Sequence, residues 1–315
     1  MADGDLPTNG RICHDKWMSD LSDDPLQLDS RVLRRRLEKA APGFDEAAVL
    51  HREVGRRLVE RLDYIRLQPA SMLDLGCASG LNTGALRKRY PKADYVAMDL
   101  AAPLVAQARR RAGRWRRVPG VCAGMDHLPF RNDSFDLVFS SLALHRVPDL
   151  SATARELQRV LRPDGVLLFA TFGPDTLDEL RSAWQAVDDT PHVHGFVDMH
   201  DIGDALVKAR LADPVMDMEH FTLTYANVRS LVRDLDALGL RNALTARQSG
   251  LTSPRRWRAM ESAYEASADA EGRIPATWEV AYGHAWGTDA QMQVTGDDGA
   301  VRMPLDTLSV PRRQR

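Results

Sequence analysis

Between residues 71 and 172, apolar segments alternate with helical segments, and this alternation constrains the fold more than any other feature of the chain. The predicted strands are short runs rich in Leu, Val, Met and Phe: 71–76, 94–100, 120–125, 135–144 and 166–172. Apolar residues recur at helical spacing in three segments between them: 81–90, 102–112 and 150–161. Apolar strands separated by helices predict an α/β fold, a doubly wound and mostly parallel sheet covered on both faces.

The regular alternation of strands and helices ends after residue 173. Four segments read as helices: 174–187, 198–211, 227–239 and 254–268. Two segments read as strands, 214–226 and 276–286, which brings the predicted sheet to seven strands. We expect these last two strands to pair as an antiparallel hairpin at the sheet edge, with a helical insertion between them.

The same patterns divide the 315 residues into one domain and two polar ends. The predicted domain spans 30–287, with N-terminal helices over 30–67 and the insertion over 227–270. The ends, 1–29 and 288–315, are polar and are predicted to be disordered.

Composition excludes several classes of protein. The net charge of −2 gives no reason to expect a nucleic-acid partner. The three cysteines show no paired spacing, and His192, His194 and His200 match no standard ligand pattern, so neither a disulfide framework nor a metal site is expected. No signal peptide and no membrane span is apparent, so we expect a cytoplasmic protein.

The stretch LDLGCASG, residues 73–80, lies where a doubly wound sheet binds its ligand, at the carboxyl end of the first strand. Asp99 closes the second strand and is placed to accept hydrogen bonds from ribose hydroxyls. Counting from Gly76, a dinucleotide fingerprint requires glycine at positions 78 and 81, where the chain has Ala78 and Leu81. The Gly-Lys-Ser/Thr ending of a phosphate-binding loop is also missing. A nucleoside cofactor other than a dinucleotide is therefore predicted.

The pattern acid-Leu-Gly-x-small-x-Gly resembles motif I of the class I S-adenosylmethionine (SAM) methyltransferases. The segments 128–149 and 156–173 resemble the fourth and fifth strands of that family, and Asp126 matches its adenine-binding acid. The resemblance implies SAM as cofactor. The implied cofactor-binding residues are Asp74, Gly76, Cys77, Ala78, Gly80, Asp99, Leu100, Asp126, His127 and Ser140.

A narrower resemblance covers about 250 residues. Five segments are similar to the malonyl-[acyl-carrier-protein] O-methyltransferases: 40–69, 172–184, 192–217, 222–243 and 272–286. Those enzymes make the methyl ester that starts pimelate synthesis for biotin. A sister group, relatives of a complex I assembly factor that modifies protein arginine, shares several of these blocks. A protein-arginine modifier, an assembly factor and a degenerate SAM-binding protein therefore stay open as alternatives.

A malonyl carboxylate is already an anion at neutral pH, so it requires a counter-charge and no general base. Arg181, on the helix after the fifth strand, is the first candidate for that charge, and Arg146 is the second. His145 is expected to line the pocket. The family usually has a Gln-Trp pair at 145–146 and glycine at 78, so these positions are departures from its pattern.

Two further groups of residues are candidates for contacts with the ligands. Phe44, Phe172 and Trp184 are candidates for walls around the sulfonium, which attracts aromatic faces. Acyl carrier proteins are acidic, so two arginine clusters are candidate docking sites for such a partner. They comprise Arg31, Arg34, Arg35, Arg36, Arg109, Arg110, Arg111, Arg114, Arg116 and Arg117.

Overall fold

The computed structural model describes residues 27–113, 118–248 and 250–289, together with two short strands near the C-terminus. These two strands, β8 (Val294–Thr295) and β9 (Val301–Arg302), form an antiparallel pair within the range predicted to be disordered. Most of the predicted disordered N-terminus, and the arginines at 114, 116 and 117, lie outside the described residues.

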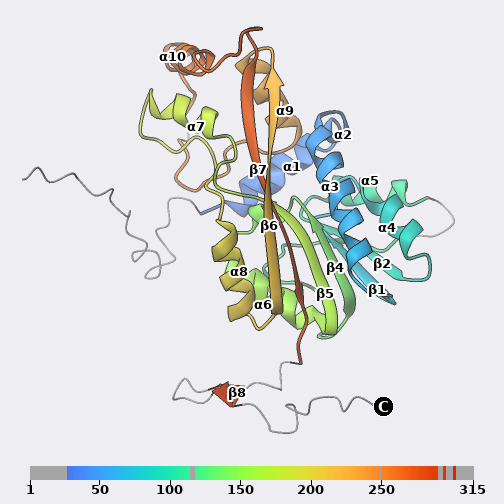
Figure 1. The fold of residues 1–315 in the computed structure, drawn as a ribbon. Helices are drawn as coiled ribbons and strands as arrows, with labels where there is room; N and C mark the ends of the chain where they lie inside the picture. Colours follow the sequence, from blue (N-terminus) through green and yellow to red (C-terminus); the bar gives the residue numbers. More distant parts are fainter. Residues whose placement is uncertain (1–26, 114–117, 249, 290–293, 296–300, 303–315) are drawn as a thin grey trace, which may run out of the picture.

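A seven-stranded sheet in the order β3-β2-β1-β4-β5-β7-β6 forms the centre of the molecule (Figure 1). Its strands are β1 (Ser71–Leu75), β2 (Asp94–Asp99), β3 (Gly120–Cys122), β4 (Phe135–Ser141), β5 (Leu161–Phe172), β6 (Ala212–Tyr225) and β7 (Ile274–Trp286). The first five strands run parallel to one another, and β7 is antiparallel to both β5 and β6. The predicted doubly wound sheet with an antiparallel edge hairpin is confirmed.

Ten α-helices are described: α1 (Ser30–Ala40), α2 (Phe44–Ala47), α3 (Val49–Arg61), α4 (Thr83–Arg89), α5 (Ala102–Arg111), α6 (Leu150–Val160), α7 (Asp178–Gln185), α8 (Met199–Lys208), α9 (Val228–Ala237) and α10 (Pro254–Glu265). Two cores lie on opposite faces of the sheet. Helices α3, α4 and α5 contribute to one, and α6 and α8 contribute to the other. Among the described residues, the helices lack an apolar stretch of the length that a membrane span requires.

Alternation of side chains along the central strands explains the two cores. In β4, Leu137 and Phe139 belong to one core and Val138 to the other, and each is at most 1% exposed. Successive side chains of a strand point to opposite faces of the sheet. A strand segment that buries both of its faces must therefore be apolar, as residues 137–139 of β4 are.

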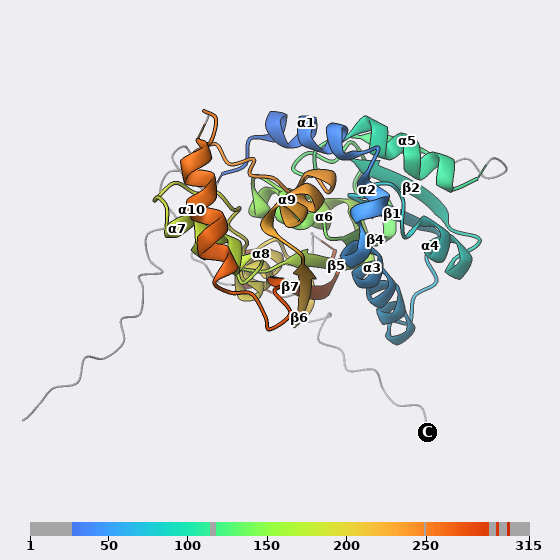
Figure 2. The same cartoon turned by 90° about the horizontal axis from the view of Figure 1, so that it is seen from above.

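The N-terminal helices and the insertion between β6 and β7 pack together over the carboxyl edge of the parallel strands. Asp29 caps α1 by accepting hydrogen bonds from the backbone N–H groups of Arg31 and Val32. The residue before it, Leu28, pairs with Leu244 in an isolated antiparallel bridge. Figure 2 shows α1 lying beside α5 and α9.

The predicted helix at 174–187 begins later, at Asp178, because its first residues are held by the sheet. The hydroxyl of Thr176 donates to the carbonyl of Glu279, and the N–H of Asp175 donates to the Glu279 carboxylate. Leu177 then takes a left-handed conformation with φ of 58°. Helical periodicity alone gave no sign of these tertiary contacts.

Candidate functional site

The loop between β1 and α4, residues 76–80, begins with a glycine that the fold requires. Gly76 has φ of 71°, and a Cβ on it would lie 2.2 Å from the Cβ of Ala143. Its N–H donates to the carbonyl of Met98 at 2.8 Å, which fixes the loop to the end of β2. The backbone at Gly76 therefore lies too close to Ala143 for any residue with a side chain to fit.

Ala78 lies in the middle of the same loop with φ of 46°. This is the left-handed region, which an L-residue with a Cβ adopts at a cost of about 1 kcal/mol. Its N–H donates to the Asp99 carboxylate at 3.0 Å. The alanine therefore occupies a position that favours glycine, and its neighbours hold it there.

We expect Ala78→Gly to raise the free energy of unfolding by up to about 1 kcal/mol, because glycine removes the strain. Thermal denaturation measures the change. Gly113→Ala is a matched opposite change, since Gly113 has φ of 89° and a Cβ at that position would have no described atom within 4 Å. It is expected to destabilise. A lower melting temperature for Ala78→Gly contradicts the strain.

A cavity of about 230 Å³ opens beside the loop and is the candidate cofactor site. Loop, strand-end and α1 residues line it together: Ser30, Leu33, Arg34, Leu37, Gly76, Asp99, Leu100, Ala123, Gly124, Met125, Asp126, Ala143, Arg146, Val147 and Pro148. Four of the predicted cofactor residues, Gly76, Asp99, Leu100 and Asp126, are among them. The sequence did not predict that α1 lines this cavity. The amphipathic pattern of a helix shows that one face is buried, but it does not show against which part of the protein that face packs.

The other predicted cofactor residues do not line this cavity. Ala78 and Gly80 shape the loop, Cys77 is buried, and the side chain of His127 is 90% exposed. Ser140 is buried, and its hydroxyl has no hydrogen-bond partner among the described residues.

Asp74 lies beneath the loop in a buried polar network. It accepts a hydrogen bond from the Tyr95 hydroxyl, which in turn contacts Thr83 Oγ1 at 3.0 Å. Burial raises the pKa of Asp74 to about 7, although the bond from Tyr95 opposes the shift. Because Thr83 is the first residue of α4, this network fixes the helix that follows the loop.

Opposite charges face one another inside the cofactor cavity. Asp99 is 3% exposed, and burial raises the pKa of its carboxyl against hydrogen bonds from Ala101 and Ala78 and the charge of Arg146. Arg146 is 7% exposed, and burial lowers its pKa while Asp99 opposes that shift. Its Nε has no hydrogen-bond partner among the described residues, and its Nη2 donates to the carbonyl of Leu238 at 3.5 Å.

These groups match the polar parts of SAM. A carboxylate can accept from ribose hydroxyls, and a second acid at Asp126 is available to an amino group. At Gly76 the place of a Cβ is taken by Ala143, and both residues line the cavity. The described residues of the cavity therefore fit this cofactor.

A second cavity of about 610 Å³ adjoins the first, and both include Val147 and Pro148 in their walls. Apolar side chains dominate its lining, among them Phe172 and Phe196. His145 also lines it and packs on Phe172 with ring centroids 4.6 Å apart. This cavity is the candidate acceptor site.

His145 is buried, and neither of its ring nitrogens has a hydrogen-bond partner among the described residues. Burial and the nearby charge of Arg146 hold its pKa well below the usual range. The imidazole is therefore neutral at pH 7, in agreement with a lining role.

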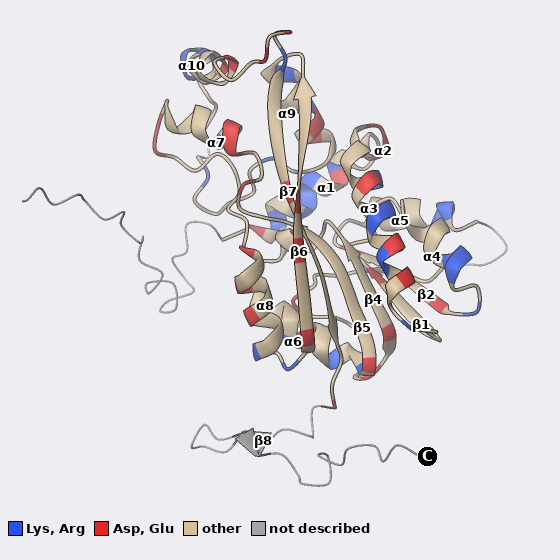
Figure 3. Ribbon diagram, in the orientation of Figure 1, with Lys and Arg blue, Asp and Glu red and all other residues tan. Residues whose placement is uncertain are grey.

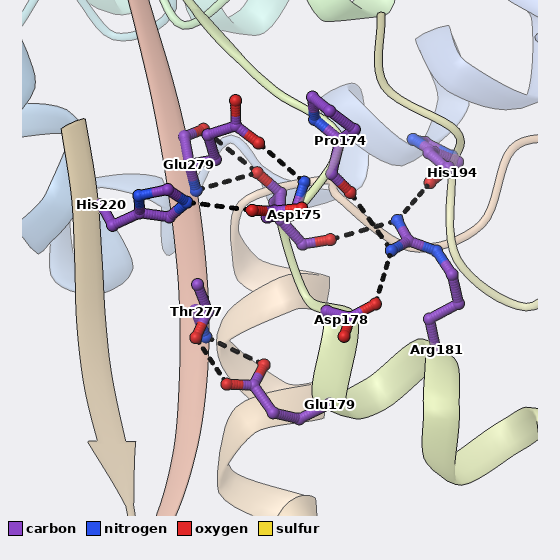
Figure 4. Close-up of polar contacts among 10 residues, drawn as sticks. Pro174, Asp175, Asp178, Glu179, Arg181, His194, His220, Thr277 and Glu279 are labelled. Carbon is purple, nitrogen blue, oxygen red and sulfur yellow. Dashed lines mark hydrogen bonds and ion pairs between the residues drawn. The ribbon is translucent and has the colours of Figure 1, made fainter. Parts of the chain in front are cut away.

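Arg181 faces the loop after β5, as Figure 4 shows. Its guanidinium donates to the backbone carbonyls of Pro174 and Thr176 at 3.2 Å and of His194 at 3.3 Å, and it also pairs with Asp178. It lines a third cavity of about 460 Å³, beyond Gly195 and Phe196, rather than the acceptor cavity. Its hydrogen-bonding capacity is thus largely taken up by the protein.

The three aromatic side chains predicted to surround the sulfonium lie in different parts of the structure. Phe172 lines the acceptor cavity. Phe44 is fully buried and packs edge-on against His51, with ring centroids 5.3 Å apart. Trp184 stacks on His192 at 3.7 Å in the wall of the third cavity.

The three histidines weighed as metal ligands each have a protein partner. His192 contacts Asp188, His200 contacts Asp198, and the ring of His194 accepts from the N–H of Ala243.

In the described part of the chain, one group of potential ligand atoms lies within 4.8 Å: those of Asp175, His220 and Glu279. His220 contacts Asp175 at 3.1 Å, and the N–H of Asp175 donates to Glu279 at 2.8 Å (Figure 4). These hydrogen bonds anchor the loop after β5.

Comparison with known proteins identifies the family. A malonyl-[acyl-carrier protein] O-methyltransferase of Halorhodospira halophila is 49% identical over 93% of this chain and 99% of its own length. One from Laribacter hongkongensis is 46% identical over 86% of this chain and 94% of its own. The chain belongs to the malonyl-[acyl-carrier protein] O-methyltransferase family. A methyltransferase-domain family model also matches residues 73–169.

Solved structures support the fold of this O-methyltransferase. The YcgJ protein of Bacillus subtilis superposes with a TM-score of 0.55 at 18% identity, covering 75% of this chain and 99% of its own. A protein from Bacillus halodurans described as a putative methyltransferase gives 0.54, also at 18% identity, with 74% and 100% covered. The fold is that of the class I methyltransferases, and the match to the methyltransferase-domain family gives SAM as the methyl donor.

Proposed function

We propose that this O-methyltransferase esterifies the free carboxylate of a malonyl group carried by acyl carrier protein, the step that starts pimelate synthesis for biotin. The curated relatives named for this activity match the chain over nearly their whole length. The observation that carries the proposal is the adjacency of two cavities, which share Val147 and Pro148 in their walls, with the buried Arg146 lining the cofactor cavity.

Bound SAM supplies an electrophilic methyl group on a sulfonium. The protein's task is to orient the acceptor and exclude water, because an in-line displacement depends on alignment. A malonyl carboxylate enters as an anion, so no residue has to remove a proton. The neutral, buried His145 and the ring of Phe172 provide an apolar wall for this purpose.

Arg146 is the better-placed counter-charge for that carboxylate. Its Nε is unpartnered among the described residues, and it lies in the cavity that adjoins the acceptor site. Arg181 instead donates three hydrogen bonds to backbone carbonyls and lines a different cavity. We therefore assign carboxylate binding to Arg146 and support of the loop after β5 to Arg181.

The test is methyl transfer in vitro. The purified protein is expected to esterify malonyl-carrier protein with SAM, detected by intact-protein mass spectrometry, and to leave acetyl-carrier protein unchanged because it has no free carboxylate. The gene is also expected to rescue a biotin-requiring strain that lacks its own malonyl methyltransferase. SAM binding by calorimetry without transfer to malonyl-carrier protein contradicts the proposed acceptor.

We further propose that the carrier protein docks on the arginines of α1. Arg31, Arg34 and Arg35 are exposed there, and Figure 3 shows basic residues on both α1 and α5. The residues just before α1, Gln27 and Leu28, line the acceptor cavity. A partner that contacts α1 is thus close to the cavity into which its acyl group enters.

The other predicted docking arginines differ in availability. Arg109 and Arg110 of α5 are exposed, whereas Arg36 is half-buried. Arg111 forms an ion pair with Asp45. Arg114, Arg116 and Arg117 lie outside the described residues.

Reversing two charges, Arg31→Glu with Arg35→Glu, is expected to raise the KM for malonyl-carrier protein by about tenfold at low salt, because steering is lost. The effect should shrink as ionic strength rises, and kcat should not change. Steady-state kinetics with malonyl-carrier protein and with malonyl-pantetheine measure it, since the small substrate has no acidic surface. Arg255→Glu with Arg258→Glu, two exposed arginines on α10, is the control. An equal rise in KM for that pair argues against docking on α1.

A further inference from the structure

Ser79 is the one residue of the 76–80 loop that the sequence patterns did not single out, and it is completely buried. Its hydroxyl donates to Asp45 Oδ1 at 2.5 Å. Asp45 lies in α2, so the bond joins the N-terminal helices to the cofactor loop. The two residues are 34 positions apart in the chain.

Arg111, the last residue of α5, completes the contact. Its guanidinium forms an ion pair with the other oxygen of Asp45 and lies 3.3 Å from the Ser79 hydroxyl. A further bond from α5 runs from Gln107 Nε2 to the carbonyl of Ala41, the residue that ends α1, at 2.7 Å. Three separate parts of the chain, α2, the loop and α5, thus meet at one carboxylate.

The contact stands next to the strained alanine. On one side Asp99 accepts the N–H of Ala78 at 3.0 Å, and on the other Asp45 holds the adjacent Ser79. Strained backbone persists where surrounding contacts over-determine it. The loop is therefore held at both sides of its least favourable residue.

We propose that Asp45, Ser79 and Arg111 form a latch by which α2 and α5 hold the cofactor loop in its SAM-binding shape. The three are positioning residues, because none of them lines the cofactor cavity. Asp45 is the central member, since it accepts from both of the others. The inference concerns cofactor binding and is independent of which acceptor is methylated.

Calorimetric SAM binding tests the latch without any acceptor. Asp45→Asn and Ser79→Ala are each expected to raise the SAM Kd by about tenfold, the loss that corresponds to one charge-assisted hydrogen bond. Asp45→Glu is expected to recover part of the affinity. Asp63→Asn is the matched control, because the Asp63–Arg89 ion pair has a similarly exposed arginine, 30% against 36%, and lies away from the loop.

A double-mutant cycle separates a latch from general destabilisation. If the latch holds a strained loop, Asp45→Asn should cost less SAM affinity in the Ala78→Gly background, because glycine adopts the loop conformation unaided. Equal losses in the two backgrounds overturn the proposal, as does an unchanged Kd in Asp45→Asn. If Ser79→Ala fails to fold, Arg111→Lys tests the same contact. Failure to methylate malonyl-carrier protein with normal SAM binding would instead count against the proposed acceptor alone.

Discussion

Arg146→Gln is expected to lower kcat/KM for malonyl-carrier protein by about a hundredfold or more, because breaking a buried ion pair costs about 3–5 kcal/mol. The arginine is 7% exposed and its Nε has no partner among the described residues, so its partner is proposed to be the substrate carboxylate. Steady-state methyl transfer measures the loss. Arg146→Lys should recover little, since it lacks the bidentate geometry.

Measurements of the melting temperature and of SAM binding distinguish a substrate-binding role of Arg146 from a structural or a cofactor-binding role. Arg146→Gln should lower the melting temperature only slightly, because relief of the desolvated guanidinium offsets the loss of the positive charge that faces Asp99. Arg181→Gln should lower the melting temperature more, through the loss of bonds to three backbone carbonyls. A weaker SAM Kd in Arg146→Gln, with an unchanged KM for malonyl-carrier protein, would assign Arg146 to the cofactor instead.

Asp99→Ala is expected to weaken SAM binding by about a hundredfold or more, since hydrogen bonds to a charged group are worth about 1.5–3 kcal/mol each. The carboxylate accepts from the N–H groups of Ala78 and Ala101 at 3.0 and 2.9 Å, and it lines the cofactor cavity. Its removal therefore takes away a ligand contact and loosens the loop. Isothermal titration calorimetry with SAM measures the change.

Asp126→Ala provides the comparison, because Asp126 lines the same cavity without holding the loop. It should weaken SAM binding less than Asp99→Ala and should not lower the melting temperature. Equal effects of the two changes would show that the contact between Asp99 and Ala78 contributes nothing to cofactor binding.

Much of the fold was predictable because its signals are local. The apolar runs of β1, β4 and β5 and the helical periodicities between them require no knowledge of distant residues. The loop at 76–80 was predictable for the same reason, since its glycines and the acid at 99 belong to a short, ordered pattern. The start of α7 was not, because Thr176 and Asp175 are held by Glu279, about a hundred residues later.

The sequence pattern could not rank Arg181 and Arg146 correctly by the contacts that their side chains make. Arg181 stood first because it lies on a helix after the fifth strand, near the edge where substrates bind. Position along the chain does not give the direction of a long side chain, and this one turns to the carbonyls of Pro174, Thr176 and His194. Arg146 departs from the family's usual pair, yet it lines the cofactor cavity and directly precedes Val147 and Pro148, which line both cavities.

The sequence by itself determined the doubly wound sheet, the edge hairpin and the family, because periodicity and ordered motifs follow from neighbouring residues. Only the tertiary structure decided the conformation of Ala78, since the sign of its φ depends on contacts made by Asp99 and Ser79. It alone showed that α1 closes the cofactor cavity and that Asp45 reaches the loop. Such contacts depend on how separate elements pack, and packing brings together residues that no local pattern relates.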